Sequence, residues 1–272
     1  MTTVARDQES RARATTLGRL GQGILDVLQI IGEAGFLLLR TVRAIAGRGR
    51  TWERTMAQLV SVGTDTLPLA FLVSLFVGMV MVVQSADQLQ AYTQEILGSI
   101  VGLAMTKELG PVIIAFLVAG RVGSATAAEI GSMKIYDEIN ALRTMDIDPV
   151  RYLAVPRLIA MALAVPMLVV YADVVGIIGG GIVVYTDPTV KISVHQYINN
   201  LAEWVNTKDI VVGLIKAFVF GVSIAVISCT FGFRTGGGAE GVARSTTAAV
   251  VWSFVLILMF DYIIVRLAIA LP

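Results

Sequence analysis

The residues of this sequence that could do chemistry are ionisable side chains set within long apolar stretches. They are Lys107, Glu108, Asp173, Lys216, Asp261 and Arg266. An isolated charge at the centre of a bilayer costs at least about 2.5 to 3.5 kcal/mol on insertion scales, so each group needs a partner, a water-filled cavity or a polar ligand. Two interpretations stay open: pairs such as Lys216 with Asp261 hold helices together, or the groups meet the polar part of a ligand.

The composition indicates an integral membrane protein. Hydrophobic residues make up 56% of the 272 residues and charged residues 15%, with a mean hydropathy of +0.78. An ordinary soluble domain has about 25% charged residues. So large an apolar share exceeds the needs of one soluble core and is typical of membrane-embedded chains. We expect no nucleic-acid partner.

Motifs of well-known enzyme classes are missing from the sequence. The glycine-rich segment GGGAEGVARST, residues 236–246, lacks the G-K-[ST] ending of a phosphate-binding loop, and neither G-x-S-x-G nor H-E-x-x-H occurs. The single Cys229 and the single His195 exclude an internal disulfide and offer no metal-type spacing. We therefore expect no catalytic residue, no metal site and no cofactor held by this chain.

Five apolar stretches are long enough to cross a bilayer as helices, which takes about 20 residues. The second stretch contains Lys107 and Glu108, followed after Leu109 by Gly110 and Pro111. A proline at this place removes a helical hydrogen bond and permits a break or a kink. The predicted spans cover residues 66–86, 96–120, 158–185, 210–233 and 246–270.

The N-terminal part differs from the spans. Residues 1–16 are polar and basic and indicate a disordered cytoplasmic tail. Residues 17–58 carry apolar side chains at helical spacing, interrupted too often by charges for a span, so we predict an amphipathic helix in the membrane interface. A helix packed on the spans without lipid contact is the alternative. Residues 59–272 then form a five-span domain, and the fold class is an all-α integral membrane protein.

The loop cations predict the orientation. The N-terminal segment, the loop between the second and third spans and the glycine-rich loop hold most of the lysines and arginines that lie outside the spans. Because basic loops stay in the cytoplasm, we expect a multi-pass protein with its N-terminus cytoplasmic and its C-terminus outside.

The loop between the second and third spans contains an amphipathic segment at about residues 129–146. Ile135, Ile139 and Leu142 share one face, while Lys134 and Glu138 lie on others. Asp148-Pro149 ends the segment, since the residue before a proline is pushed out of the helical region. We predict a helix that contacts a cytoplasmic partner.

Several segments together resemble the MlaE/YrbE permease family, the membrane subunits of MCE-type ATP-binding-cassette (ABC) transporters that move phospholipids or other lipids across bacterial envelopes. The resemblance covers about residues 65–266. It is carried by KELGPVIIAFLVAGRVGSATAAEIGSMK at 107–134, INAL at 139–142, DPVRYLAVPR at 148–157, IKAFVFG at 215–221 and GGAEGVARSTTAAVV at 237–251.

The resemblance implies a transport subunit in the bacterial inner membrane, with partners and roles for individual residues. A second permease copy would complete a homodimer, ATP and Mg²⁺ would bind on a separate ATPase subunit, an MCE-domain protein would sit outside, and some systems add a STAS-domain protein. The residues that would contact lipid are Tyr92, Lys107, Glu108, Asp209, Lys216 and Asp261. The residues that would couple the permease to the ATPase are Glu129, Met133, Lys134, Asp137, Glu138 and Leu142. Glu138 stands where the family commonly carries Gln, which adds negative charge to the docking surface.

Two other functions compete with this interpretation. An ion-coupled secondary transporter would use Glu108, Asp173 and Asp261 as ion or proton sites, but the inverted repeats that usually accompany this class are not visible in the sequence. A non-transporting scaffold would only anchor partners at the membrane. Lipid bound to the purified protein would distinguish a transporter from a scaffold.

Overall fold

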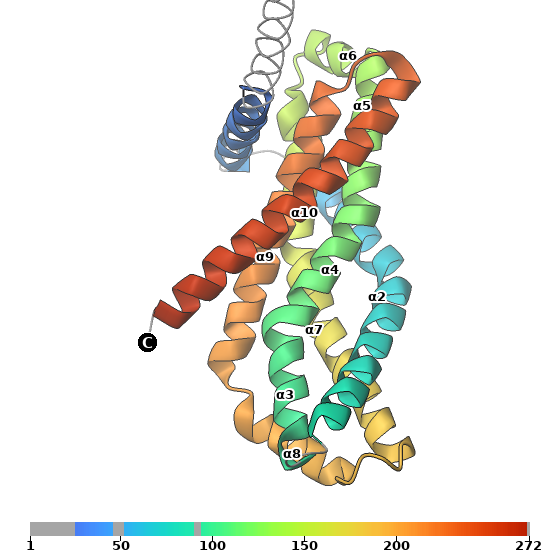
Figure 1. Cartoon of the computed structure of the whole chain (residues 1–272). Coiled ribbons are helices and arrows are strands. Elements are labelled where there is room, and N and C mark those ends of the chain that lie inside the picture. Colours follow the sequence, from blue (N-terminus) through green and yellow to red (C-terminus); the bar gives the residue numbers. More distant parts are fainter. Residues whose placement is uncertain (1–24, 46–51, 90–93, 271–272) are drawn as a thin grey trace, which may run out of the picture.

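The computed structural model describes residues 25–45, 52–89 and 94–270, and these residues form a bundle of helices without strands (Figure 1). Within them, five helical segments are long and apolar enough to cross a membrane. The prediction of an all-α protein with five spans is therefore confirmed. The segments are Trp52–Leu89, Gln94–Ile135, Val150–Thr186, Thr207–Arg234 and Gly238–Ala270.

A helix at residues 25–45 lies at the same end of the bundle as α6 (Figure 1). Ile30, Ala34 and Leu37 are buried, whereas Leu28 and Phe36 are among several exposed apolar side chains. The helix thus packs one face on the bundle and keeps an apolar face that suits contact with lipid. Its place in the membrane interface stays a prediction, and the predicted tail at 1–16 lies outside the described residues.

The first span, α2, runs from Trp52 to Leu89, so residues 52–58 belong to it and not to the N-terminal helix as expected. No proline or glycine interrupts the chain from Trp52 to residue 62, and the helix therefore starts well before the apolar stretch. It packs along α7, Val155–Thr186. The two backbones touch at Gly78, where a Cβ would lie 1.8 Å from the carbonyl oxygen of Gly176.

The second span is one long helical path with two π-helical turns. It comprises α3 (Leu97–Ala104), η2 (Met105–Leu109), α4 (Gly110–Val118), η3 (Ala119–Gly123) and α5 (Ser124–Ile135). Arg121 follows the end of the predicted second span, 96–120, and was therefore expected in the basic loop, but it lies inside η3 and donates to Thr66 Oγ1 at 3.1 Å. The small and helix-compatible residues after it let the helix continue to Ile135.

The predicted single helix at 129–146 does not form. The chain turns at Tyr136 and Asp137 before α6, Glu138–Thr144, because Asp137 adopts a left-handed backbone with φ 58°. Asp146 has φ 57° and ends this short helix in the same way. Aspartate tolerates this conformation better than most residues, which explains why two acids mark the two ends. The π-helical turn η4, Val150–Ala154, then leads into α7.

The remaining helices complete the bundle. At the end opposite α6, the short α8, Val194–Trp204, begins at Ser193, whose hydroxyl accepts from the N–H of Gln196 at 3.2 Å (Figure 1). It leads into α9, Thr207–Arg234, which returns through the bundle to the α6 end. Gly237 and Gly238, both with positive φ, make the turn into α10, Gly238–Ala270.

Candidate functional site

Lys216 is the centre of a charge network inside the bundle. Its ammonium nitrogen lies 2.8 Å from Glu108 Oε2, 2.9 Å from Asp261 Oδ1 and 2.9 Å from the carbonyl oxygen of Lys107. The Lys216 side chain is fully buried, while Glu108 and Asp261 are 45% and 20% exposed. One cation therefore joins three spans, since Glu108 stands on the second, Lys216 on α9 and Asp261 on α10.

The π turn η2 explains why a backbone oxygen takes part. In a regular α-helix the carbonyl of Lys107 would accept from the N–H of residue 111, but residue 111 is a proline and has none. The N–H of Gly110 bonds to the carbonyl of Met105, five residues back. An uncompensated carbonyl in this apolar setting is costly, and Lys216 supplies the missing donor.

A glycine one turn before Lys216 lets α9 approach the backbone of the second span closely. A Cβ on Gly213 would lie 2.3 Å from the carbonyl oxygen of Thr106, well inside van der Waals contact. Gly213 and Lys216 are three residues apart and share a helix face. The close contact at Gly213 thus sets the distance that the Lys216 side chain has to span.

A second ion pair extends the network toward α8. Lys107 Nζ lies 2.8 Å from Asp209 Oδ1, and their side chains are 44% and 14% exposed. Asp209 also accepts from the backbone N–H of Asn206 at 3.1 Å, as the third helical residue of a capping box at the start of α9. The carboxylate therefore fixes the first turn of α9 and the Lys107 side chain together.

The structure brings together five of the six side chains predicted to contact lipid. Lys107 and Glu108 are the most exposed of them, whereas Lys216 is enclosed and can act on a ligand only through its two carboxylate partners. Tyr92, the sixth, lies outside the described residues. The ion pairs agree with the interpretation that these groups hold helices together, and contact with the polar part of a ligand stays a prediction.

Two further ionisable residues of the spans stand apart from the network. Asp173 on α7 faces the same π turn, since a Cβ on Gly110 would lie 1.9 Å from Asp173 Oδ1, and this buried oxygen has no hydrogen-bond partner among the described residues. Arg266 is exposed on α10. No group of three or more potential metal ligands occurs in the part of the chain that the structure describes.

The residues predicted for ATPase coupling all lie in or near α6, at the same end of the bundle. Their environments differ. Glu129 pairs with the buried Arg157 at 2.6 Å, and Lys134 donates to the carbonyl of Phe233 at the end of α9. Asp137 accepts from the Asn140 side chain at 2.8 Å, and Glu138 is exposed.

Two apolar members of the predicted coupling set face the core. Met133 is half-buried against the core, and Leu142 is buried within it. Leu142 therefore supports the turn from inside and cannot itself contact a partner.

The exposed apolar side chains of this turn were missed by the sequence analysis. Tyr136 and Met145 are 76% and 60% exposed and flank α6 on its two sides. Periodicity could not find them because both stand outside the helix, next to residues with left-handed backbones. Their signal is chemical: large apolar residues in an otherwise polar turn.

Comparison with known proteins shows the family to which this chain belongs. The sequence model described as Permease MlaE matches residues 55–267. The chain belongs to the MlaE permease family. The resemblance drawn from the KELG, INAL and DPVRYLAVPR segments is confirmed.

Relatives of this MlaE-family chain carry names that agree with the family. A probable ABC transporter permease protein of Rickettsia bellii is 36% identical over 250 residues, which cover 91% of this chain and 95% of the relative. The intermembrane phospholipid transport system permease protein MlaE of Haemophilus influenzae is 32% identical over 250 residues, with the same coverage. The chloroplastic protein TRIGALACTOSYLDIACYLGLYCEROL 1 of Arabidopsis thaliana is 38% identical over 214 residues, 78% of this chain and 61% of that protein. The chain is thus a permease subunit of an ABC transporter and not a catalytic one.

Proposed function

We propose that this permease moves phospholipid, or a related lipid, between the inner membrane and an MCE-domain partner outside it, using ATP hydrolysed on a separate subunit. The observation that carries the proposal is the outward-facing part of the charge network. Lys107 and Glu108 expose a cation and an acid side by side at membrane depth, and Asp209 and Lys216 hold them in place. A headgroup that carries both charges, or a phosphate, would find complementary groups there.

The second span offers a physical link between this network and the ATPase. It runs as one helical path from Leu97 to Ile135, so that η2 near one end and the turn at Tyr136 at the other belong to the same element. Movement of that turn would shift η2 along with it. The π turns η2 and η3 interrupt the regular α-helical hydrogen bonding and are places where such a helix can bend.

The partner at the turn would be the ATPase. We name the exposed residues Tyr136, Glu138, Ala141 and Met145 the docking surface. It combines apolar side chains with an acid, as a groove on a partner protein would require. ATP and Mg²⁺ would bind on that partner, and Lys134 and Glu129 would hold the docking surface to α9 and α7 through Phe233 and Arg157.

The charge distribution supports an orientation with the N-terminus and α6 in the cytoplasm and the C-terminus outside. A second copy of the chain would complete the lipid cavity, and exposed apolar side chains along α10, among them Val255, Leu258 and Tyr262, leave room for such a contact. An MCE-domain protein would meet the α8 end. A STAS-domain protein would join, where present, on the cytoplasmic side.

Reconstitution tests the proposal. Proteoliposomes that contain the permease, its ATPase and the MCE partner should transfer labelled phospholipid only when ATP is hydrolysed. Glu108→Gln should lower this transfer, whereas Glu203→Gln, at an exposed acid of α8 outside the network, should not. Transfer that follows an ion gradient without ATP would favour a secondary transporter, and a complex that holds its partners but no lipid would favour a scaffold.

A further inference from the structure

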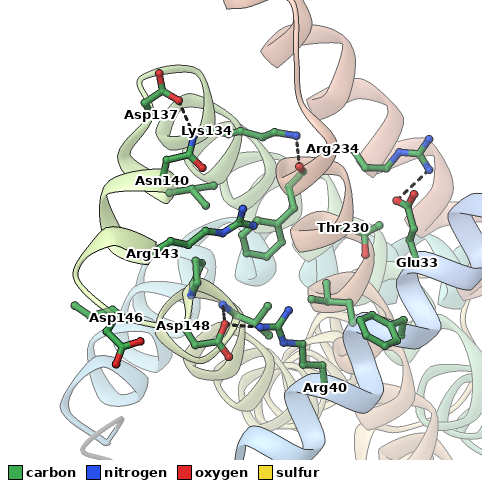
Figure 2. Close-up of a pocket in the computed structure, with 17 residues that line it drawn as sticks. Glu33, Arg40, Lys134, Asp137, Asn140, Arg143, Asp146, Asp148, Thr230 and Arg234 are labelled. Atoms are coloured by element: carbon green, nitrogen blue, oxygen red, sulfur yellow. Dashed lines mark hydrogen bonds and ion pairs between the residues drawn. The ribbon is translucent and has the colours of Figure 1, made fainter.

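A second hollow lies at the α6 end, far along the bundle from the charge network. It is a groove of about 840 Å³ between the helix at residues 25–45, the α6 region and the end of α9 (Figure 2). Its walls combine charged side chains with apolar ones such as Phe36, Ile147 and Phe233. The proposed transport mechanism uses one lining residue, Lys134, as a tie to α9, and assigns no ligand to the hollow itself.

Four cations and four acids line the groove, but only two of the cations pair with two of the acids. Arg40 pairs with Asp148 at 2.9 Å and Arg234 with Glu33 at 3.3 Å, which closes the groove at two places. The backbone carbonyl of Arg143 accepts from the N–H of Asp146, but its guanidinium forms no hydrogen bond or ion pair with any residue in the ranges that the structure describes.

Lys134 adds a second positive charge without a carboxylate. It donates only to the carbonyl of Phe233, and it experiences the charges of Arg143 and Arg234 as well as that of Glu33. Like charges that share one groove repel each other, and an anion between them lowers this repulsion.

The two acids that remain form no ion pair with Arg143 or Lys134 in the described part of the chain. Asp137 accepts from Asn140, and both Asp137 and Asp146 stand at the edge of the drawn lining, on the side of α6 (Figure 2). The guanidinium of Arg143 instead reaches inward beside the groove's apolar wall (Figure 2). Arg143 and Lys134 are thus the two cations of the groove that form no ion pair with a carboxylate in the described part of the chain, and an anion that enters would be attracted to both.

The apolar wall selects the kind of anion. The helix at residues 25–45 contributes Phe36 and Leu37 to the groove and exposes Leu28, Ile31 and Leu39 beyond it. Such a surface suits acyl chains, whereas a small hydrated ion gains nothing from it. A cationic pocket beside an apolar helix matches an amphiphile with a phosphate headgroup.

We infer that this groove binds the phosphate headgroup of an anionic phospholipid from the cytoplasmic leaflet, with Arg143 and Lys134 on the phosphate and the acyl chains along the helix at residues 25–45. The inference rests on the orientation proposed above, which sets the α6 end in the cytoplasm. The bound lipid is a ligand distinct from the lipid that is transported. It fastens the N-terminal helix to the segment that leads into the docking surface.

Photocrosslinking on the full chain tests this site. A photoreactive benzoylphenylalanine replaces Phe36, and the protein is placed in phosphatidylcholine nanodiscs with or without phosphatidylglycerol. Mass spectrometry of the irradiated protein should find phosphatidylglycerol adducts in preference to phosphatidylcholine adducts. Arg143→Gln should reduce the phosphatidylglycerol adduct about tenfold, the effect of losing one charge-assisted contact.

Two variants serve as controls. Arg143→Lys keeps the charge and should retain most of the adduct. Arg244→Gln removes an exposed arginine of α10 that pairs with Glu240 outside the groove, and it should leave the adduct unchanged. An Arg143→Gln protein that behaves like the Arg244→Gln protein would overturn the inference.

Other outcomes assign the groove to a different ligand. Loss of the adduct in millimolar inorganic phosphate would point to a soluble phosphate compound, and a crosslink to the ATPase in the assembled complex would point to protein; each overturns the lipid site. ATP-driven transfer measured on the same preparation separates the two proposals. Transfer without the adduct contradicts only the groove, and the adduct without transfer contradicts only the proposed function.

Discussion

Lys216 supplies the hydrogen bond that Pro111 cannot make. Proline at position 111 leaves the carbonyl oxygen of Lys107 without its helical donor, and the ammonium of Lys216 lies 2.9 Å from that oxygen. A break in one span is thus repaired from another span. The same ammonium neutralises Glu108 and Asp261, so the repair also fixes the charges of the site.

Removal of this single cation should strongly destabilise the protein. Lys216→Met leaves two carboxylates and a carbonyl uncompensated, and breaking a buried pair in this way costs about 3 to 5 kcal/mol. Thermal unfolding in detergent should show the loss. The triple variant with Glu108→Gln and Asp261→Asn removes the stranded charges as well and should lie closer to the unaltered protein. A Lys216→Met protein as stable as the unaltered one would show that the network holds nothing together.

Gly213 should be intolerant of even one methyl group. In Gly213→Ala the new Cβ would lie 2.3 Å from the carbonyl oxygen of Thr106, and backbone cannot yield as a side-chain tip can. The helices must separate, at a cost of about 1 to 3 kcal/mol typical of overpacking. Gly181→Ala is the matched control, because nothing lies within 4 Å of its Cβ position. That variant should keep or gain stability, and equal melting temperatures for the two variants would contradict the close contact.

Sequence patterns predicted the spans because apolar stretches of sufficient length have few alternatives in a membrane. They also placed Lys107 and Glu108 at a break, since Gly110 and Pro111 make one. The pairing of Lys107 with Asp209 and of Glu108 with Lys216 could not be derived from pattern alone. These partners are about a hundred residues apart, and only the packing of α9 on the second span brings them together.

The α6 region was harder to predict for a local reason. Its helical spacing continues across Tyr136 and Asp137, and nothing in the residue types forces a break there. The break follows from tertiary packing, which buries Ile139 and Leu142 against Val150 and Leu153 and requires the chain to turn first. Leu142, which was predicted for ATPase coupling, is therefore internal, while Tyr136 faces outward.

Tyr197 should make the protein sensitive to alkaline pH. Tyr197 stands on α8, and the burial of its side chain raises the pKa of its hydroxyl to about 12, from an ordinary value near 10. Between these values the unfolded chain loses the proton while the folded chain keeps it, so the free energy of unfolding falls by up to about 1.4 kcal/mol per pH unit. Below pH 10 both states keep the proton and the group contributes no pH dependence.

Melting curves of the Tyr197→Phe variant check this effect. Its hydroxyl makes only a long contact of 3.5 Å with the carbonyl of Ile177, so the substitution should cost about 1 kcal/mol or less at pH 8. Above pH 10 the variant should lose stability less steeply than the unaltered protein. Parallel curves across the alkaline range would show that Tyr197 ionises as readily in the folded state as in the unfolded one.

Tyr136 should be a main contact of the docking surface with the ATPase. An exposed aromatic side chain on a structured turn is a typical anchor, and replacing one with a charged residue costs about 2 kcal/mol or more, roughly a thirtyfold loss of affinity. Tyr136→Asp should therefore weaken co-purification of the ATPase and abolish stimulation of its activity by the permease. Tyr185→Asp is the matched control, because Tyr185 is 82% exposed and lies near the end of α7 that faces α8. Equal ATPase binding by both variants would place the docking site elsewhere. Tyr136 directly follows the second span, which carries the Lys107-Glu108 pair, whereas Tyr185 does not.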